Sequence, residues 1–320
     1  MFKIIVTLGP SILKGDTLKM LPREHPYIFR LNGSHISYNY ARDLVKKIRK
    51  AVKEAVILLD LPGNKVRTTN LERPINLMVG KKFCLTDDMI NHKIFFDRVK
   101  VGDVIRAHDS LLKFEVINKK KKSVSFISHS NGILNKNKGL HLCGLTDGID
   151  FLTEQDKVLL EIAKNLRIDC VGVSYVRDKQ DILLIRDYMR KKDFIPDIFV
   201  KIETKRAIEN LNSIFSEANN FILDRGDLSS EVGIENISLF QRKIIVEAKK
   251  KNRNLFLATQ FLKSMIHNPL PFIAEVNDLH NVLADGISGL QLSDETAIGK
   301  YPLEAINTII AIRKNIEKLL

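Results

Sequence analysis

The chain has 320 residues, 44% of them hydrophobic, so it is long and apolar enough to bury one large core or two ordinary ones. Its three cysteines lack metal-ligand spacing, which favours reduced thiols in a cytoplasmic protein. We expect no membrane span, because no apolar run approaches about 18 residues, and "MFKIIVTL" is too short for a signal peptide.

The formal charge of +13 could indicate nucleic-acid binding. The lysines are scattered without a recognised motif, so we favour a compositional bias and no nucleic-acid partner.

Short apolar strands alternate with helical stretches, a pattern that predicts a parallel sheet built from βα units. Eight strands are expected, at residues 2–8, 27–31, 55–61, 170–175, 198–203, 220–223, 255–259 and 288–293. Helical periodicity is clearest at 40–53, 238–251 and 302–319. No glycine-rich phosphate loop follows a strand, which disfavours a doubly wound sheet. The predicted fold is therefore α/β, a (β/α)8 TIM barrel.

Residues 68–145 break this alternation. They contain the β-rich pieces "INLMVGKKFCL", "KIFFDRVKVGDVIRAHD" and "LLKFEVINKKKKSVSFIS", separated by turn residues. The lysine run at 118–123 is expected at a solvated hairpin tip. We therefore predict a small all-β lid domain inserted after the third barrel strand, with the barrel domain formed by residues 1–67 and 146–320.

Polar side chains follow most of the predicted strands. In a TIM barrel the C-terminal strand ends share one face, and that face carries the active site. The candidates are Arg30, Asn32, Ser34 and His35; Asp60, Lys65 and Arg67; Ser174 and Arg177; Lys201 and Glu203; Asp227; Thr259 and Gln260; and Ser293 and Glu295. Each residue alone could be a solvated loop residue, but together they predict a catalytic face.

The residue types on this face suit one chemistry. The carboxylates of Glu203 and Asp227 are suited to share one Mg²⁺, which prefers oxygen ligands. Arg30 and Lys201 are suited to phosphate and to charge that develops during phosphoryl transfer. Gly226 would let a ligand approach the backbone closely. A metal-bound enolate that a lysine stabilises is one chemistry that these groups could perform.

Ten segments, nearly end to end and in order, resemble the pyruvate kinase family: "KIIVTLGPS", "RLNGSH", "LLDLPGNKVR", "KGLHLCG", "VSYVRDKQD", "VKIET", "RGDLS", "ATQFLKSM", "NPLPFIAEVND" and "LSDETAIGKYPLEA". The inserted β region falls where that family has its lid. The resemblance implies a cytoplasmic, Mg²⁺- or Mn²⁺-dependent phosphotransferase that acts on phosphoenolpyruvate, or a related enol phosphate, and a nucleotide. The family's C-terminal regulatory domain has no counterpart before Leu320, so a homo-oligomer is left open.

The resemblance also implies roles for individual residues. Glu203 and Asp227 would hold the divalent metal. Lys201 would neutralise the transferring phosphoryl group and the enolate, and Arg30 would contact phosphate. The family pattern further assigns Thr259 and the Gly226 backbone to the substrate carboxylate, Ser174 and Ser293 to the substrate side, and Arg67, His35 and Asn32 to the nucleotide side.

The family's monovalent-cation site is altered in this chain. Asn32, Ser34 and Asp60 match the family pattern, but its threonine is replaced by Leu61 and a nearby glutamate by Lys65. A fixed ammonium group can serve the electrostatic role of a potassium ion. We therefore predict that Lys65 is a surrogate cation and that K⁺ is not required.

Three further departures bear on the substrate. Gln155 replaces a lysine on the nucleotide side, Leu13 replaces an arginine, and Asp224 adds a carboxylate beside the pocket for the acid. The lost cations weaken the case for ordinary ADP binding, and the added carboxylate argues for a changed substrate. Two alternatives stay open: a metal-dependent C–C lyase or aldolase acting on a 2-oxo acid, and a non-catalytic paralogue.

The remaining histidines and cysteines give no functional signal. His108, His141 and His267 are interpreted as structural or solvent-facing. Cys143 and Cys170 are expected to be buried small hydrophobic residues rather than nucleophiles, because the sequence places no base near them.

Overall fold

The computed structural model describes residues 1–108, 110–145 and 149–318. Eight parallel strands close into a barrel in the spatial order β1-β15-β14-β13-β12-β11-β3-β2. Their bounds are β1 Lys3–Thr7, β2 Tyr27–Asn32, β3 Val56–Asp60, β11 Cys170–Val173, β12 Asp197–Ile202, β13 Asn220–Asp224, β14 Asn254–Ala258 and β15 Gly289–Leu292. The (β/α)8 barrel and each of its eight expected strands are confirmed.

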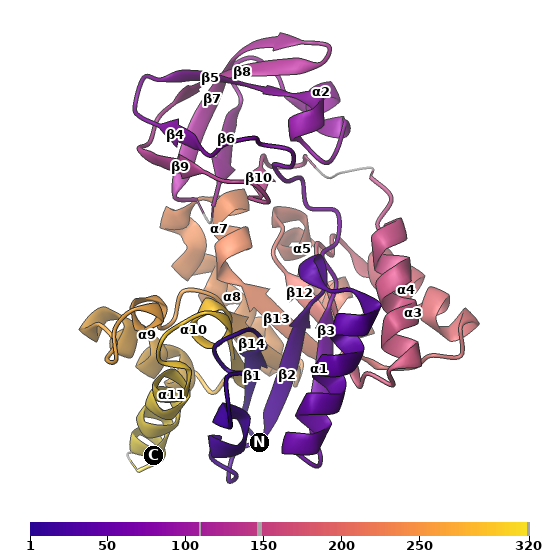
Figure 1. Cartoon of the computed structure of the whole chain (residues 1–320), viewed down its shortest axis with the longest axis vertical. Helices are drawn as coiled ribbons and strands as arrows, with labels where there is room; N and C mark the ends of the chain where they lie inside the picture. The colour runs from indigo at the N-terminus through magenta and orange to yellow at the C-terminus, as the bar shows by residue number, and fades with distance from the viewer. Residues whose placement is uncertain (109, 146–148, 319–320) are drawn as a thin grey trace.

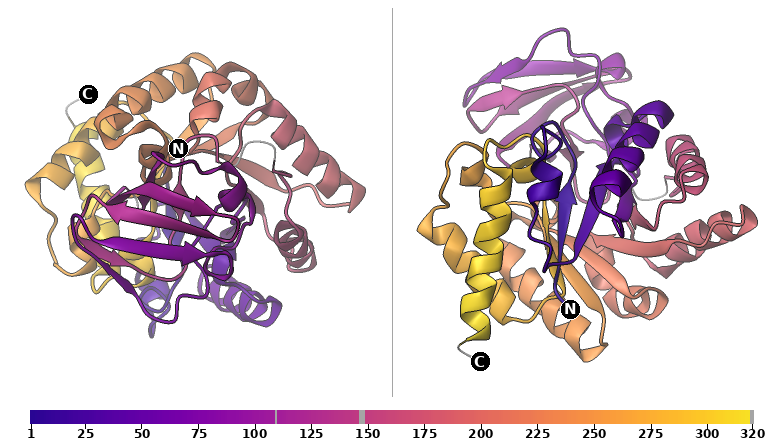
Figure 2. Two further views of the ribbon diagram at one scale, coloured as in Figure 1. Left: turned by 90° about the horizontal axis from the view of Figure 1, so that it is seen from above. Right: turned by 60° about the horizontal axis from the view of Figure 1, so that its bottom comes forward.

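Helices surround the barrel (Figures 1 and 2). The α-helices of the barrel are α1 Tyr38–Ala51, α3 Glu154–Asn165, α4 Lys179–Lys191, α5 Lys205–Glu209, α6 Leu211–Glu217, α7 Arg225–Val232, α8 Ile237–Lys250, α9 Ile273–Ala284, α10 Asp294–Ala297 and α11 Pro302–Glu317. Short 3₁₀ helices lie at Thr17–Met20, Gly33–His35, Asp87–Met89, Ile234–Asn236 and Lys263–Ile266. The three helices with the clearest periodicity are confirmed as α1, α8 and α11; the end predicted for the last one, at residue 319, lies outside the described residues, as does Leu320.

Side-chain alternation along the strands builds two layers of core. In β1, Ile5 packs inside the barrel, whereas Ile4 and Val6 pack against the surrounding helices. The interior layer also contains Phe199 of β12 and Phe256 of β14, with ring centroids 5.3 Å apart. Side chains therefore fill the barrel, and apolar residues dominate this interior layer.

The insert carries its own sheets and core. A five-stranded antiparallel sheet has the order β10-β6-β7-β8-β5, and β4 pairs with β9. The bounds are β4 Ile75–Leu77, β5 Lys82–Thr86, β6 Val104–Ala107, β7 Leu112–Lys120, β8 Ser123–Ser128, β9 Gly132–Leu134 and β10 Leu140–His141. The turn between β7 and β8 is exposed, as expected of the lysine-rich hairpin tip.

One segment of the insert was expected to be β-rich and is helical instead: α2, Ile94–Arg98. The reason is that Phe95 and Phe96 are both buried in the core of the insert. Consecutive residues of a strand point to opposite faces, whereas one helical turn directs both rings to the same side.

The insert lies over the end of the barrel opposite the N-terminus (Figure 1), and the view from above shows its sheet lying across the barrel (Figure 2). It contacts the barrel where the Ser110 hydroxyl lies 3.0 Å from that of Ser230 and 3.3 Å from that of Ser229, both in α7. The junction predicted at residues 145–146 borders residues 146–148, which lie outside the described part. Among the described residues, every helix is too short or too polar to cross a membrane.

Candidate active site

Every second side chain of a strand points to the same face, and this alternation places charged side chains in the barrel mouth. Ile28 and Ile222 are interior residues, so Arg30 and Asp224, two positions further along, point the same way. Lys201 follows Phe199 in β12 by the same count. These charged residues are nearly buried, and Lys201 is only 5% exposed. Strand geometry thus brings together residues that are far apart in the sequence.

Lys201 is the centre of an ion-pair network. Its ammonium lies 3.0 Å from Glu203, 3.2 Å from Asp224 and 3.8 Å from Asp60. Although burial alone would lower it, these carboxylates hold the pKa of Lys201 well above its usual range. Lys201 therefore remains a cation, fixed in the mouth of the barrel.

Arg30 is anchored beside this lysine. It contacts Asp60 through Nε at 2.8 Å and Nη2 at 2.6 Å, and Nη1 donates to the Thr7 hydroxyl at 3.0 Å. Asp60 is 3% exposed. Burial alone would raise its pKa, but Lys201 and Arg30 lower it. The guanidinium is thereby held in one orientation, as recognition of a phosphate group requires.

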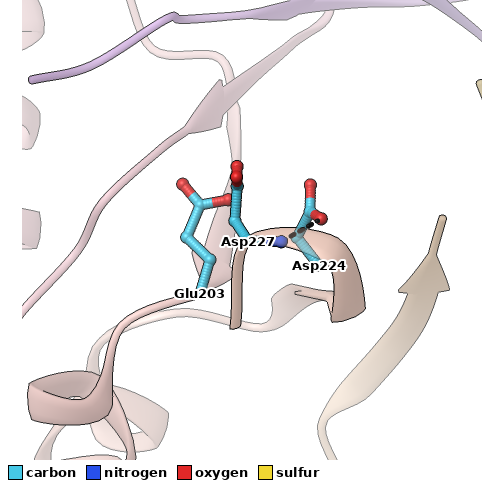
Figure 3. Close-up of side chains that lie close together, drawn as sticks. All are labelled: Glu203, Asp224 and Asp227. Carbon is cyan, nitrogen blue, oxygen red and sulfur yellow. Dashed lines mark hydrogen bonds between the residues drawn. The ribbon is translucent and has the colours of Figure 1, made fainter. Parts of the chain in front are cut away.

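Three carboxylates converge next to the lysine. Glu203 directly follows β12, Asp224 ends β13, and Asp227 lies in the first turn of α7 (Figure 3). One oxygen from each lies within 4.8 Å of the other two. Such crowding of negative charge is relieved by a bound cation, and the all-oxygen donor set suits a hard divalent ion.

Two residues from beyond the barrel strands hold Asp227. Lys65 forms an ion pair with Asp227 Oδ1, and His141 Nε2 lies 3.5 Å from the same oxygen. His141 is 5% exposed and lies in β10 of the insert. The interpretation of His141 as a residue without functional signal is therefore incomplete, because the structure brings it to this carboxylate.

The pKa values of the two proposed metal ligands, Glu203 and Asp227, are shifted in opposite directions. Burial raises the pKa of Glu203 to about 7, although Lys201 opposes the shift. Burial also acts on Asp227, but Lys65, His141 and Lys201 hold its pKa well below its usual range. For His141, burial and the neighbouring Lys65 lower the pKa to about 3, so its imidazole is neutral near pH 7. At that pH, Asp227 is ionised, while Glu203 is poised between its two protonation states.

A cavity of about 510 Å³ opens beside the network. Its lining includes Arg30, Asp224, Thr259, Gln260 and Ser293. The Gly226 N–H donates to the Thr259 hydroxyl at 2.8 Å. Thr259 and Gln260 have φ angles of 71° and 57°, a left-handed conformation that costs free energy and is frequent at functional sites. The turn after β14 is thus held in a strained shape that faces the cavity.

The predicted monovalent-cation residues also lie together. A smaller cavity of about 170 Å³ is lined by Asn32, Ser34, Asp60, Lys65 and Leu61, together with Ser174 and Lys201. The Asn32 side chain accepts a hydrogen bond from the Ser34 N–H at 3.2 Å.

Of the residues predicted for the nucleotide side, Arg67 lines another hollow of about 180 Å³, together with Ser34 and Gln155. Asn32 does not line this hollow but lines the two cavities described above. The side chain of His35 lies outside the described part of the chain. Leu13, where the family pattern has an arginine, packs against the core between strands and helices.

Some strand-end candidates have other partners. Arg177 forms an ion pair with Asp181 in the first turn of α4, at 2.8 Å. Glu295 accepts a hydrogen bond from the Ser293 N–H at 2.8 Å. Cys170 is buried as expected, but the prediction for Cys143 is wrong, because this residue is exposed in the segment that follows β10.

Comparison with known proteins agrees with this architecture. Residues 1–306 match the family model described as "Pyruvate kinase, barrel domain". The chain is 32% identical to a pyruvate kinase of Thermotoga maritima, covering 99% of this chain and 71% of that protein. It is 30% identical to a pyruvate kinase of Dictyostelium discoideum, covering 98% and 66%, and 31% identical to one of Clostridium perfringens, covering 98% and 70%.

Proposed function

This chain belongs to the pyruvate kinase family, and on that premise we propose that it transfers a phosphoryl group from phosphoenolpyruvate to ADP, or in reverse, without a need for potassium. In the forward direction the bond between the enol oxygen and phosphorus breaks, and a bond forms between that phosphorus and a terminal ADP oxygen. The enolate left behind takes a proton at its methylene carbon and becomes pyruvate. The ion-pair network around Lys201 is the observation that carries this proposal.

Glu203 and Asp227 would hold a divalent ion, Mg²⁺ or Mn²⁺. The fit rests on their all-oxygen donors and on the crowding of three carboxylates within 4.8 Å, which a cation relieves. When bound, such an ion supplies Lewis-acid stabilisation of negative charge on the substrate. Asp227 is suited to this because Lys65 and His141 lie at its Oδ1 and hold its pKa well below its usual range, so that it is ionised.

Lys201 and Arg30 act on the anion. The permanently charged Lys201 stabilises negative charge on the transferring group and on the enolate oxygen. The guanidinium of Arg30, fixed by Asp60, orients the phosphate. The Gly226 N–H donates a hydrogen bond to the Thr259 hydroxyl in this structure. Both groups would instead contact the substrate carboxylate when the substrate binds.

Lys65 takes the place of a monovalent cation. Lys65 lines the same small cavity as Asn32, Ser34 and Asp60, and its ammonium is paired with Asp227. A cation that belongs to the chain supplies positive charge without any ion being recruited from solution. Activity should therefore be independent of potassium.

The test is a reaction with phosphoenolpyruvate, ADP and Mg²⁺ in which pyruvate and ATP are measured together. The proposal predicts equal amounts of both products, and their loss in Lys201→Met. Pyruvate formed without ATP, or no product at all with folded protein, would contradict it. The first of these outcomes would favour hydrolysis or lyase chemistry on the same enolate.

A further inference from the structure

Asp224 is a carboxylate that the proposed reaction does not use. It is the last residue of β13 and, two positions after the interior residue Ile222, points into the barrel mouth. It is 7% exposed and lines both the large cavity and the smaller one beside it. Its side chain is therefore part of the wall of the candidate site.

The contacts of Asp224 join the metal side of the site to the anion side. One oxygen lies 3.2 Å from the ammonium of Lys201. The other accepts a weak hydrogen bond, 3.4 Å long, from the Asp227 N–H and so caps α7 (Figure 3). Its carboxylate also lies within 4.8 Å of ligand oxygens of Glu203 and Asp227.

This extra carboxylate shifts the charge of the network. Four carboxylates are linked by ion pairs to three cations, namely Asp60, Glu203, Asp224 and Asp227 to Arg30, Lys65 and Lys201. With all four carboxylates ionised, the negative charges exceed the positive ones by one, and without Asp224 the two signs would balance. In a buried site a single charge acts strongly on ligands a few ångströms away, because little water screens it.

We propose that Asp224 is a specificity-determining residue that strengthens divalent-cation binding and weakens the binding of the anionic substrate. The inference rests on the proposed function, because it assumes that Glu203 and Asp227 hold the ion. With all four carboxylates ionised, the free site has an excess of negative charge, which attracts the cation and repels an anion. Cation binding reverses this balance, so the site binds the divalent ion first and the anion second.

The test uses Asp224→Asn, which keeps the size of the side chain and an oxygen that can cap α7. Mn²⁺ binding to the free protein is measured by electron paramagnetic resonance, and oxalate binding at saturating Mn²⁺ by calorimetry. We expect the dissociation constant for Mn²⁺ to rise about tenfold and that for oxalate to fall about tenfold, since one charge is removed at a few ångströms from both ligands. The opposite signs distinguish this role from a structural one, in which both affinities would fall.

Asp294→Asn is the matched control. Asp294 lines the same large cavity but is exposed and belongs to a different strand end. We expect its replacement to leave Mn²⁺ binding within about twofold of the wild type, because solvent screens an exposed charge. If Asp224→Asn does not fold, as judged by circular dichroism, Asp224→Ala provides the same comparison.

The outcomes separate this inference from the proposed function. Wild-type protein that binds neither Mn²⁺ nor oxalate would contradict the proposed site itself. Wild-type protein that binds both, together with Asp224→Asn affinities that are unchanged or that fall together, would overturn the role of Asp224 alone. Equal effects of Asp224→Asn and Asp294→Asn would overturn it as well, because they would show a general effect of net charge.

Discussion

The ammonium of Lys65 forms an ion pair with the carboxylate of Asp227, although the two residues are 162 positions apart. Lys65 lies between β3 and the insert, and Asp227 lies in the first turn of α7. The ammonium also lies 5.8 Å from the ring centroid of Tyr175, in the turn after β11. The Lys65 ammonium thus connects the segment that leads into the insert with Asp227, a proposed metal ligand.

Replacement of Lys65 tests this connection. We expect Lys65→Met to lower kcat at least about 100-fold, because the buried Asp227 loses the partner that keeps it ionised and oriented. Steady-state kinetics with and without potassium provide the measurement. Lys100→Met is the control, because Lys100 is exposed on the insert. A kcat for Lys65→Met close to that of Lys100→Met would rule out the role of Lys65.

Lys201→Met should abolish turnover while the barrel remains folded. The loss of the ammonium removes the charge that stabilises the transferring phosphoryl group, and we expect kcat to fall by about 1,000-fold or more. Three carboxylates also lose their shared partner. Circular dichroism and thermal melts with saturating Mg²⁺ check that the fold survives. Turnover in Lys201→Met near that of the wild type would remove this lysine from the mechanism.

The affinity for the divalent ion should depend on pH through Glu203. Burial raises the pKa of this carboxyl to about 7 in the metal-free protein, so a cation must displace a proton below that pH. We expect affinity for Mn²⁺ to rise by up to about tenfold per pH unit up to pH 7 and to level off above it. Titrations of Mn²⁺ between pH 5.5 and 8.5, at a spacing of about half a unit, measure this. The variant Glu203→Gln should bind Mn²⁺ more weakly, and its affinity should no longer depend on pH. A wild-type affinity that does not change with pH would contradict this role of Glu203.

His141 should contribute to metal binding without being a ligand. Its Nε2 lies 3.5 Å from Asp227 Oδ1, and groups that orient metal-binding carboxylates typically change affinity by about 10- to 100-fold. We expect His141→Ala to weaken Mn²⁺ binding about tenfold and His141→Asn, which keeps an N–H donor, to retain more of it. The control is His267→Asn, on an exposed histidine of the barrel. Equal Mn²⁺ affinity in His141→Ala and His267→Asn would show that His141 only packs.

The sequence predicted the parts of this site that depend on strand ends. The eight strands and the position of Lys201 and Glu203 follow from local apolar patterns and from the geometry of a barrel. The orientation of Asp224 follows only once Ile222, two residues earlier, is known to be an interior residue. What was missing was the knowledge of which face of β13 is interior.

The contacts that cross from the insert to the barrel could not be predicted. His141 reaches Asp227 from β10, and no local pattern encodes how β10 lies relative to α7. The helix α2 was missed for a related reason, because the burial of Phe95 and Phe96 depends on strands distant in sequence. Such features depend on tertiary packing, which overrides local propensity.

The most direct measurement is the initial rate of pyruvate formation from phosphoenolpyruvate and ADP with Mg²⁺, in potassium buffer and in a matched buffer that contains only tetramethylammonium. We expect robust turnover that is equal in both buffers, because the Lys65 ammonium already supplies the monovalent charge beside Asp227. Turnover only in potassium would contradict the role of Lys65. The absence of turnover in both buffers, with folded protein that still binds oxalate in the presence of Mg²⁺, would mean that the enolate site serves another substrate.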